Sequence, residues 1–346
     1  MRVLVAMSGG VDSSVAAALL VEEGHDVVGA TLKLWGGPSD SGCCSVADVD
    51  DARRVAQQLG IDHHVFNLTD EFEAQVVGPY VAAHAAGRTP NPCIECNRHI
   101  KFDRLLARSR RLGFDALATG HHARVERADG GGHRLRRGAD PLKDQSYVLS
   151  MLDREQLAGI VLPVGHLTKS QVREHAARLG LRTAGKPDSQ DVCFVHGDVG
   201  REGFLSRRMA LHPGTVVDRS TGDAVGRVDA VELVTVGQRR GMGQGADGGR
   251  RYVVAVDVPA RRVLVGSSEE ATVEGVALTS ITWVAGPLAP GTPAVAQVSA
   301  HGRPVPCRFE AGGTVRFTER QRPVAPGQTV ALYDHDVVVG AGIVKR

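Results

Sequence analysis

The chain has 346 residues, which is too long for one small domain and predicts two or three compact units. Lys and Arg number 41 against 39 Asp and Glu, so any surface for nucleic acid has to come from local clusters of basic residues. No apolar run is long enough to cross a membrane, and no charged leader precedes the first apolar run, which predicts a cytoplasmic protein. Six cysteines are too few for a disulfide scaffold, so we expect catalytic, metal-binding or core thiols.

Up to about residue 190, apolar runs typical of buried strands alternate with segments of helical periodicity. The expected strands cover residues 2–7, 26–34, 64–68 and 116–119, and the expected helices cover 12–23, 47–59, 70–86 and 97–112. Strands separated by helix-length segments require crossover connections, which produce a parallel sheet covered by helices. The sequence therefore predicts an α/β domain with a doubly wound, Rossmann-like parallel sheet.

After about residue 205 the helical periodicity ends, and short β-rich runs are separated by Gly and Pro. The expected strands cover residues 214–217, 231–236, 252–258, 263–265, 294–299, 329–333 and 337–343. Short strands at this spacing are typical of barrels and sandwiches. We therefore expect three units: the α/β domain at 1–204, a small β-rich middle domain at 205–274 and a C-terminal β-barrel at 275–346.

The most informative stretch is SGGVDSS at residues 8–14, between the first expected strand and the first expected helix. Backbone N–H groups at such a helix start converge on an anion, and the two glycines let a phosphate approach the backbone closely. The hydroxyl groups of Ser8 and Ser13 add hydrogen-bond donors. The stretch has no lysine, so it is not the P-loop of enzymes that cleave the γ-phosphate. It predicts a nucleotide site, and the alternative is an ordinary glycine turn.

Two other glycine patterns do not have the context that a nucleotide site requires. Residues 180–186 have the Walker spacing, but Pro187 stands where a Mg²⁺-binding hydroxyl is needed, and the segment follows a helix. Residues 243–248 spell GxGxxG, but a strand follows them instead of a helix. We therefore expect no nucleotide motif at either place.

Three cysteines stand out from the others. Cys93 and Cys96 lie three residues apart, where a proline-stiffened loop enters a helix whose dipole would stabilise a thiolate. Cys193 lies in a polar, turn-prone segment at the edge of the α/β region, whereas Cys307 in the β-rich part is expected to serve packing. A structural zinc site is not favoured, because no second CxxC and no histidine pair at ligand spacing is present.

Seven short motifs follow one another along the chain. They are SGGVDSS at 8–14, GCCS at 42–45, TPNPCIECN at 89–97, ATGH at 118–121, KDQSY at 143–147, GKPDSQD at 185–191 and VGQRRG at 236–241. In this order they resemble the tRNA-specific 2-thiouridylase family from end to end. The first motif also resembles the pyrophosphate-binding loop of the ATP pyrophosphatase (PP-loop) superfamily.

The resemblance implies a tRNA-uridine 2-sulfurtransferase that uses ATP and Mg²⁺ to adenylate O2 of wobble uridine-34 in Lys, Glu and Gln tRNAs and then replaces this oxygen with sulfur. It implies contact with the tRNA anticodon arm, and a cysteine desulfurase or sulfur-relay protein as persulfide donor. In such an enzyme Cys96 would be the nucleophile and Cys193 would carry the persulfide. The residues implied for ATP are Ala6, Met7, Ser8, Gly9, Gly10, Val11, Asp12, Ser13, Leu32 and Gly120. Those implied for tRNA are Asn91, Pro92, Cys93, Lys143, Asp144 and Gln145.

The chain departs from the family pattern at two places. Cys93 stands where the family can have an aspartate acting as general acid or base, and a thiol can take that role only with a perturbed pKa. An alternative is that Cys93, Cys96 and Cys193 hold a [4Fe–4S] cluster with one open iron. Ser299 replaces a basic tRNA contact, and Arg303 is the nearest substitute.

Clusters of arginine suit a long, negatively charged partner such as tRNA. They are Arg108/Arg110/Arg111, Arg134/Arg136/Arg137, Arg207/Arg208, Arg239/Arg240 and Arg250/Arg251. Three other functions stay open: an ammonia-using PP-loop synthetase of the NAD or GMP type, an Fe–S-dependent tRNA thiolase and a non-enzymatic RNA-binding module. A PP-loop synthetase would not need the pair Cys96 and Cys193, so the thiols distinguish it from a sulfurtransferase.

Overall fold

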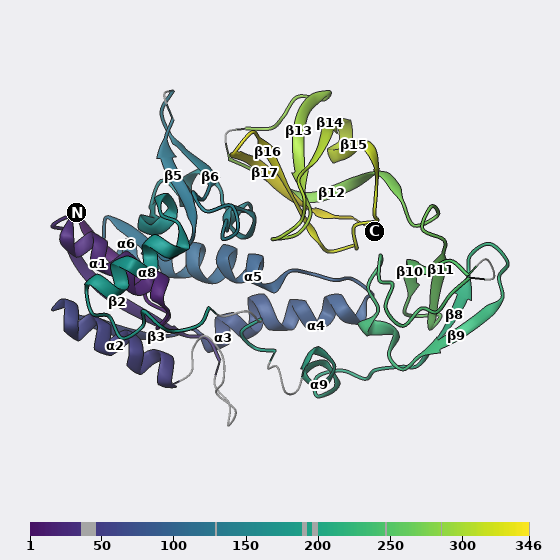
Figure 1. The fold of residues 1–346 in the computed structure, drawn as a ribbon, viewed down its shortest axis with the longest axis horizontal. Coiled ribbons are helices and arrows are strands. Elements are labelled where there is room, and N and C mark those ends of the chain that lie inside the picture. Colours follow the sequence, from purple (N-terminus) through teal and green to yellow (C-terminus); the bar gives the residue numbers. More distant parts are fainter. Residues whose placement is uncertain are drawn as a thin grey trace.

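The computed structural model describes residues 1–35, 46–128, 130–188, 192–195, 200–245, 248–284 and 286–345. Its N-terminal unit contains a parallel sheet of the order β3-β2-β1-β4-β7 (Figure 1), which confirms the predicted α/β class. The strands are β1 (Arg2–Ala6), β2 (Asp26–Lys33), β3 (His63–Asn67), β4 (Ala116–Thr119) and β7 (Ile160–Val161). The helices α1 (Val11–Glu22), α2 (Val46–Leu59), α7 (Arg154–Leu157) and α8 (Lys169–Arg178) belong to the same unit. Val3, Leu4 and Val5 of β1 are fully buried, as expected for a central strand covered on both faces.

The strand order reverses at β1. This strand pairs in parallel with β2 on one side and with β4 on the other. The chain therefore leaves the carboxyl ends of β1 and β4 at a topological switch point, where doubly wound sheets bind their ligands. The loops that begin at Met7 and Gly120 meet at this edge of the sheet.

Two helical rods lie between the parallel sheet and the β-rich units (Figure 1). The first comprises α3 (Thr69–Phe72), the π-helical segment Glu73–Val77 and α4 (Gly78–Ala85). The second comprises α5 (Pro92–Glu95), the π-helical segment Cys96–Leu105 and α6 (Leu106–Arg111). The predicted start of the second rod at residue 97 was wrong, because Asn91 caps the helix and Pro92 occupies its first position. Cys93 and Cys96 thus lie within the first helical turns.

The middle unit has a four-stranded sheet of the order β10-β11-β8-β9. Its strands are β8 (Gly214–Asp218), β9 (Ala224–Val228), β10 (Tyr252–Asp257) and β11 (Arg262–Gly266), and α9 (Gly200–Ser206) precedes them. The strand predicted at 231–236 was wrong, because Val231–Leu233 forms a 3-10 turn. Val231 and Val234 both pack into the core of this unit, and their three-residue spacing suits a turn of helix better than alternation.

The C-terminal unit is a closed barrel of six antiparallel strands, in agreement with the sequence prediction. Its strands are β12 (Val273–Trp283), β13 (Thr292–Gln297), β14 (Val305–Glu310), β15 (Thr314–Gln321), β16 (Thr329–Asp334) and β17 (Val337–Val344). The order β12-β15-β14-β13-β16-β17 closes because β12 also pairs with β17. Closure removes the unpaired edges that an open sheet of this size would expose.

A hairpin of the N-terminal unit extends the barrel sheet. It consists of β5 (Ala123–Arg127) and β6 (His133–Arg137), and β6 pairs antiparallel with β17. Asp336, in the turn after β16, accepts hydrogen bonds from Arg124 at 2.9 Å and from Arg136 at 3.0 and 3.1 Å. The guanidinium of Arg137 lies 3.8 Å from the ring centroid of Tyr333. The hairpin therefore fixes the barrel to the unit that contains the switch point.

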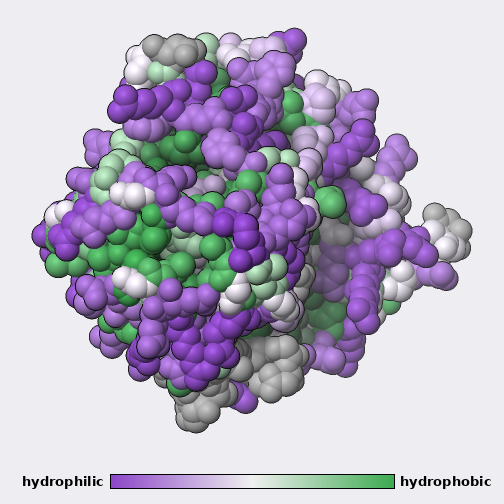
Figure 2. Space-filling model, turned by 60° about the vertical axis from the view of Figure 1, so that its left-hand side comes forward, coloured by the Kyte–Doolittle hydropathy of each residue, from purple (hydrophilic) through white to green (hydrophobic). Residues whose placement is uncertain are grey.

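The face shown in Figure 2 is largely hydrophilic, with a group of hydrophobic residues gathered in its left-hand part. Across the described parts of the chain, no helix combines the length and apolar character that a membrane span requires. Exposed large hydrophobic side chains such as Val46, Leu112 and Leu142 occur singly along the sequence. Single exposed hydrophobic residues are normal on a protein surface.

Candidate active site

The predicted phosphate loop lies at the switch point, between β1 and α1. Gly9 has a φ of +73°, and a Cβ atom there would overlap the backbone carbonyl of Asp48 in α2. Only glycine therefore satisfies both the backbone conformation and the close approach of α2. Gly10 is the N-cap of α1 and provides no side-chain cap, so the first N–H groups of the helix remain for an anion.

Serine hydroxyl groups hold the shape of this loop. Ser8 N–H donates to Ser13 Oγ at 3.1 Å, and the two hydroxyl oxygens lie 3.3 Å apart. The hydroxyl groups of Ser13 and Ser14 donate to the carbonyl of Gly10 at 3.2 and 2.8 Å. Ser13 and Ser14 are buried, whereas Ser8 is exposed at the rim. The loop is thus organised by its own side chains, with Ser8 the hydroxyl most open to a ligand.

The loop after β4 closes the site from the other side of the switch point. A Cβ atom at Gly120 would overlap the backbone of Asp12 and Ser13, so this position also needs glycine. The next residue, His121, is buried, with its Nδ1 2.7 Å from Thr119 Oγ1. Burial holds the pKa of His121 well below its usual value, so this imidazole is neutral at physiological pH.

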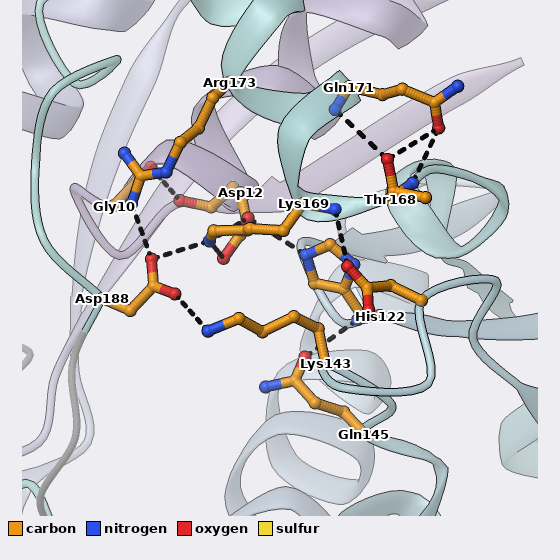
Figure 3. Close-up of polar contacts among 12 residues, drawn as sticks. Gly10, Asp12, His122, Lys143, Gln145, Thr168, Lys169, Gln171, Arg173 and Asp188 are labelled. Atoms are coloured by element: carbon orange, nitrogen blue, oxygen red, sulfur yellow. Dashed lines mark hydrogen bonds and ion pairs between the residues drawn. The ribbon is translucent and has the colours of Figure 1, made fainter.

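Lys169, the first residue of α8, lies between the carboxylate of Asp12 at the start of α1 and that of Asp188 on a loop (Figure 3). Its Nζ is 2.7 and 2.8 Å from the two carboxylate oxygens of Asp12 and 2.8 Å from Asp188 Oδ1. Asp12 also lies 3.1 Å from His122 Nε2. Burial raises the pKa of Asp12, but the hydrogen bonds from His122 and Lys169 outweigh it and keep this pKa below its usual value.

Asp188 is surrounded by three cations. Besides Lys169, it accepts a hydrogen bond from Lys143 Nζ at 2.8 Å and one from Arg173 at 3.0 Å (Figure 3). Partial burial raises the pKa of Asp188, but the hydrogen bonds from Lys143 and Lys169 prevail and lower it to about 2. Asp188 is therefore ionised throughout the physiological pH range.

Lys186 contacts the phosphate loop directly. Its Nζ donates to the carbonyl of Gly9 at 3.0 Å and to Asp48 and Asp51 at 2.6 and 2.8 Å. Burial lowers the pKa of Lys186, but the hydrogen bonds to the two aspartates outweigh it and raise this pKa. Residues 180–186 are not a P-loop, yet their lysine fixes the glycine loop to α2.

Sequence reasoning did not predict Lys169, Arg173, His122 or Asp188 as site residues. The available signal was the scarcity of lysine, since Lys169 is one of only six in the chain. Their approach to the loop depends on tertiary structure, because Lys169 and Asp12 are 157 positions apart.

The predicted thiols lie beside an apolar cluster. Asn91 accepts hydrogen bonds from the backbone N–H groups of Cys93 at 3.1 Å and of Ile94 at 3.4 Å, which places Cys93 at the exposed start of α5. Cys96 is only 8% exposed and belongs to the large core cluster of the N-terminal unit. Cys193 is partly buried and packs against the same cluster. The fold therefore brings two thiols that are 97 positions apart to one hydrophobic region.

Phe194 anchors the segment that carries Cys193. Its ring is buried, with centroids 5.1 Å from Phe204, 5.4 Å from Tyr80 and 5.7 Å from Phe72. Aromatic rings in such tilted and edge contacts attract each other beyond simple burial. The packing of Phe194 therefore holds its neighbour Cys193 at this cluster.

The residues predicted to touch tRNA differ in what they contact. Asp144 accepts hydrogen bonds from Arg137 at 2.7 Å and from the backbone of Gly138 at 3.0 Å. Gln145 Oε1 accepts from the backbone N–H of His122 at 2.8 Å. Arg303 is exposed in the turn between β13 and β14. Gln145 thus ties the loop after β6 to the switch point, and Asp144 holds Arg137, which contacts Tyr333 of the barrel.

The thiols do not form a metal site in the described residues. Within these ranges no group of three or more His, Cys, Asp or Glu side chains is arranged to hold a metal ion. Cys93, Cys96 and Cys193 are all among the residues described, so they do not converge as cluster ligands here. Cys307 is buried in the barrel, and burial raises the pKa of its thiol to about 11. The motif at 42–45 and residues 189–191 lie outside the described residues.

Comparison with known proteins agrees with this architecture. The model of the tRNA methyl transferase HUP domain family matches residues 1–197, that of the tRNA methyl transferase PRC-barrel domain matches 202–267, and that of the aminomethyltransferase beta-barrel domain matches 273–344. The three matches define a class of protein in which a HUP domain precedes a PRC-barrel and a β-barrel.

Relatives over the whole length narrow the class further. A tRNA-specific 2-thiouridylase MnmA of Roseiflexus sp. (strain RS-1) is 46% identical over 373 residues, covering 100% of this chain and 99% of the relative. The protein of the same name from Thermobifida fusca (strain YX) is 45% identical over 355 residues, with 100% and 96% covered. A solved structure, a 4-thiouridine synthetase–RNA complex with bound ATP, is 17% identical to this chain. Its TM-score is 0.35, and the match covers 56% of this chain and 44% of that chain. The chain belongs to the tRNA-specific 2-thiouridylase family.

Proposed function

We propose that this protein is a tRNA uridine 2-sulfurtransferase. It uses ATP to adenylate O2 of wobble uridine-34 in Lys, Glu and Gln tRNAs and replaces that oxygen with sulfur. The observation that carries the proposal is full-length identity of 46% to a tRNA-specific 2-thiouridylase, together with an SGGVDSS loop at the switch point. C2 of uridine is a poor electrophile with a poor leaving oxygen, so the adenylate is needed to make AMP the leaving group.

The phosphate loop binds ATP in this proposal. The loop and its surroundings comprise Ala6, Met7, Ser8, Gly9, Gly10, Val11, Asp12, Ser13, Leu32 and Gly120. The uncapped start of α1 and the Ser8 hydroxyl suit the leaving diphosphate. Mg²⁺ bound with ATP would neutralise phosphate charge, and the carboxylate of Asp12, which also contacts Lys169, would hold this ion.

Sulfur transfer uses Cys193 and Cys96. The terminal sulfur of a Cys193 persulfide attacks C2 and AMP departs with the former O2; Cys96 thiolate then attacks the Cys193 sulfur and releases 2-thiouridine. In the other order, Cys96 attacks Cys193 first and the released hydrosulfide attacks C2. Both routes end in a Cys96–Cys193 disulfide that an external thiol must reduce. The packing of both cysteines against one apolar cluster supports this pairing.

Cys93 lies at the exposed N-terminus of α5, where a thiolate is stabilised by the helix dipole. We propose it as an acid or base toward the target uridine, together with Asn91 and Pro92 as residues that face this base. The [4Fe–4S] alternative finds no support in the arrangement of Cys93, Cys96 and Cys193 described above, so no step is assigned to a cluster.

The substrate is the tRNA anticodon arm, and uridine-34 has to leave the base stack to reach the thiols. Lys143, Asp144, Gln145 and the exposed Arg303 are the proposed tRNA contacts. A cysteine desulfurase or sulfur-relay protein in the cytoplasm would load Cys193. The three-part division with boundaries near residues 204 and 274 stays a prediction.

Nucleoside mass spectrometry of tRNA tests the proposal. Deletion of the gene should remove 2-thiouridine from position 34, and only a copy that retains Cys193 should restore it. A strain carrying Cys193→Ala that still makes normal amounts of 2-thiouridine would refute the sulfur-transfer step. An ammonia-using synthetase would release AMP without tRNA and would not respond to Cys96→Ala or Cys193→Ala.

A further inference from the structure

The ammonium group of Lys169 lies beside the phosphate loop, in contact with Asp12 and Asp188. Asp12 is the second residue of α1, and Lys169 Nζ lies 2.7 Å from its carboxylate. The charge is therefore next to the uncapped N-terminus of the helix. The Lys169 side chain is only 11% exposed, so its charge is poorly screened by water.

The fold holds Lys169 firmly in this position. Thr168 and Gln171 form a capping box at the start of α8, and the backbone N–H of Lys169 donates to Asp140 at 2.9 Å. Val172 and Ala176 of α8 pack in the same core cluster as residues of α1. A lysine on a capped helix that packs against α1 is preorganised for a ligand of the loop.

Asp188 lies on a loop, whereas the other carboxylates of the site lie on helices. Asp12 lies on α1, and Asp48 and Asp51, which bind Lys186, lie on α2. Asp188 lies on a loop, yet three cations surround it: Lys143, Lys169 and Arg173. A set of three cations around one oxyanion is the arrangement that proteins use to bind phosphate.

We propose that Lys169 binds the phosphates of ATP and that Asp188 is an internal anion which the triphosphate displaces from Lys169 and Arg173. The inference rests on the proposed function only in taking ATP as the ligand. Lys169 keeps its bond to Asp12 and exchanges a carboxylate oxygen of Asp188 for a phosphate oxygen. Lys186 keeps both of its helix-borne carboxylates and continues to hold Gly9.

Isothermal titration with MgATP in the absence of tRNA tests both roles. Lys169→Met should weaken binding by about 10-fold or more, because a hydrogen bond between charged groups is lost. Lys345→Met, which removes an exposed lysine at the far end of the chain, is the matched control and should bind as the wild type does. Asp188→Asn should tighten binding several-fold, because the competing anion is gone. Inorganic pyrophosphate should show the same order of variants, and adenosine should show no difference between them.

Two outcomes would overturn the inference. Equal MgATP affinity of folded Lys169→Met and wild type would remove Lys169 from the phosphates. Weaker binding by Asp188→Asn would show that Asp188 supports the site instead of competing for it. If circular dichroism shows that Lys169→Met is unfolded, the sign of the Asp188→Asn effect decides. If the wild type thiolates tRNA but the variants give these outcomes, only this inference is refuted. If the wild type binds no ATP, the proposed function is refuted as well.

Discussion

At the phosphate end of the candidate site, Lys143, Lys169, Lys186 and Arg173 contact carboxylates at 2.6 to 3.0 Å. At the thiol end, Cys96 and Cys193 pack against aromatic and aliphatic side chains. The first end is built from charges that already have partners. The second is built from groups that exclude water. The two ends therefore differ in chemical character, one charged and the other apolar.

The difference follows from what each end must do. A triphosphate brings negative charge that fixed cations can meet without reorganising water. A persulfide is reactive toward other thiols, and an apolar surrounding limits such side reactions. If this contrast is functional, changes at one end should leave the other end intact.

The largest expected effect is at the thiol end. Cys193→Ser and Cys96→Ser should each lower tRNA thiolation by at least about 1000-fold, because each removes a covalent participant of the proposed mechanism. MgATP affinity should not change, since Cys96 belongs to the apolar cluster and Cys193 packs against it. Thiolation is measured by nucleoside mass spectrometry and affinity by calorimetry. Cys307→Ala, in the barrel, is the control and should alter neither quantity. A loss of ATP binding in Cys193→Ser would break the separation of the two ends.

A change at the phosphate end should give the reverse result. Gly9→Ala should weaken MgATP binding by about 10- to 100-fold, since a Cβ atom would push α2 away and distort the donors. Gly60 has a similar φ of +70° but no atom near its missing Cβ, so Gly60→Ala should cost only about 1–2 kcal/mol of stability. Calorimetry and thermal unfolding measure both variants. Equal ATP affinities would mean that the loop conformation at Gly9 is not needed.

The two ends should also respond differently to pH. At the thiol end, the ring of His84 lies 4.7 Å from that of Tyr80, which packs against Phe194. Burial and the nearby Arg201 lower the pKa of His84 to about 4, against 6.5 in the unfolded chain. Its contribution to stability is therefore complete above pH 6.5 and is lost as the pH falls toward 4. The lowered pKa of Asp188, about 2, gives a contribution that is complete above pH 4 and is lost as the pH falls through 2.

Denaturation at a series of pH values measures this difference. Near pH 5, unfolding of His84→Gln should take up about one proton fewer than unfolding of the wild type, which is a slope difference of about 1.4 kcal/mol per pH unit. Asp188→Asn should leave this slope unchanged and flatten only the loss below pH 4. The same proton uptake in wild type and His84→Gln would mean that His84 is not held neutral by the fold.

The smallest effect is expected where the barrel joins the N-terminal unit. Asp336→Asn weakens the ion pairs with Arg124 and Arg136 and should cost about 1 kcal/mol of stability, because these groups are partly exposed. Asp334→Asn is the control, since this side chain is 74% exposed and its contact with His335 is 3.8 Å long. Thermal unfolding compares the two variants. A larger loss in Asp334→Asn would mean that the hairpin contacts do not fix the barrel.

Local patterns in the sequence determined much of the fold. The apolar run at Arg2–Ala6 and the SGGVDSS stretch predict a buried strand followed by an anion-binding turn, and both are present. The β-rich character of the last third predicts the barrel. Local reasoning failed at 231–236, where a strand-like composition forms a turn around the buried Glu232. The predicted start of the second helical rod was five residues late. The helix begins at Pro92 because Asn91 has an extended backbone and caps the N–H groups of Cys93 and Ile94.

Tertiary structure alone decided how distant residues combine. Lys169 reaches Asp12 because α8 packs on α1, and Asp188 reaches Lys169 and Arg173 because its carboxylate lies beside α8. The pairing of β6 with β17 joins segments about 200 positions apart and turns Arg136 and Arg137 toward the barrel. A repeating pattern of apolar residues defines which face of an element is buried, but it does not specify which other element will cover that face. The sequence therefore determines which chemical groups are available to this site, and the packing of the elements determines how those groups are arranged.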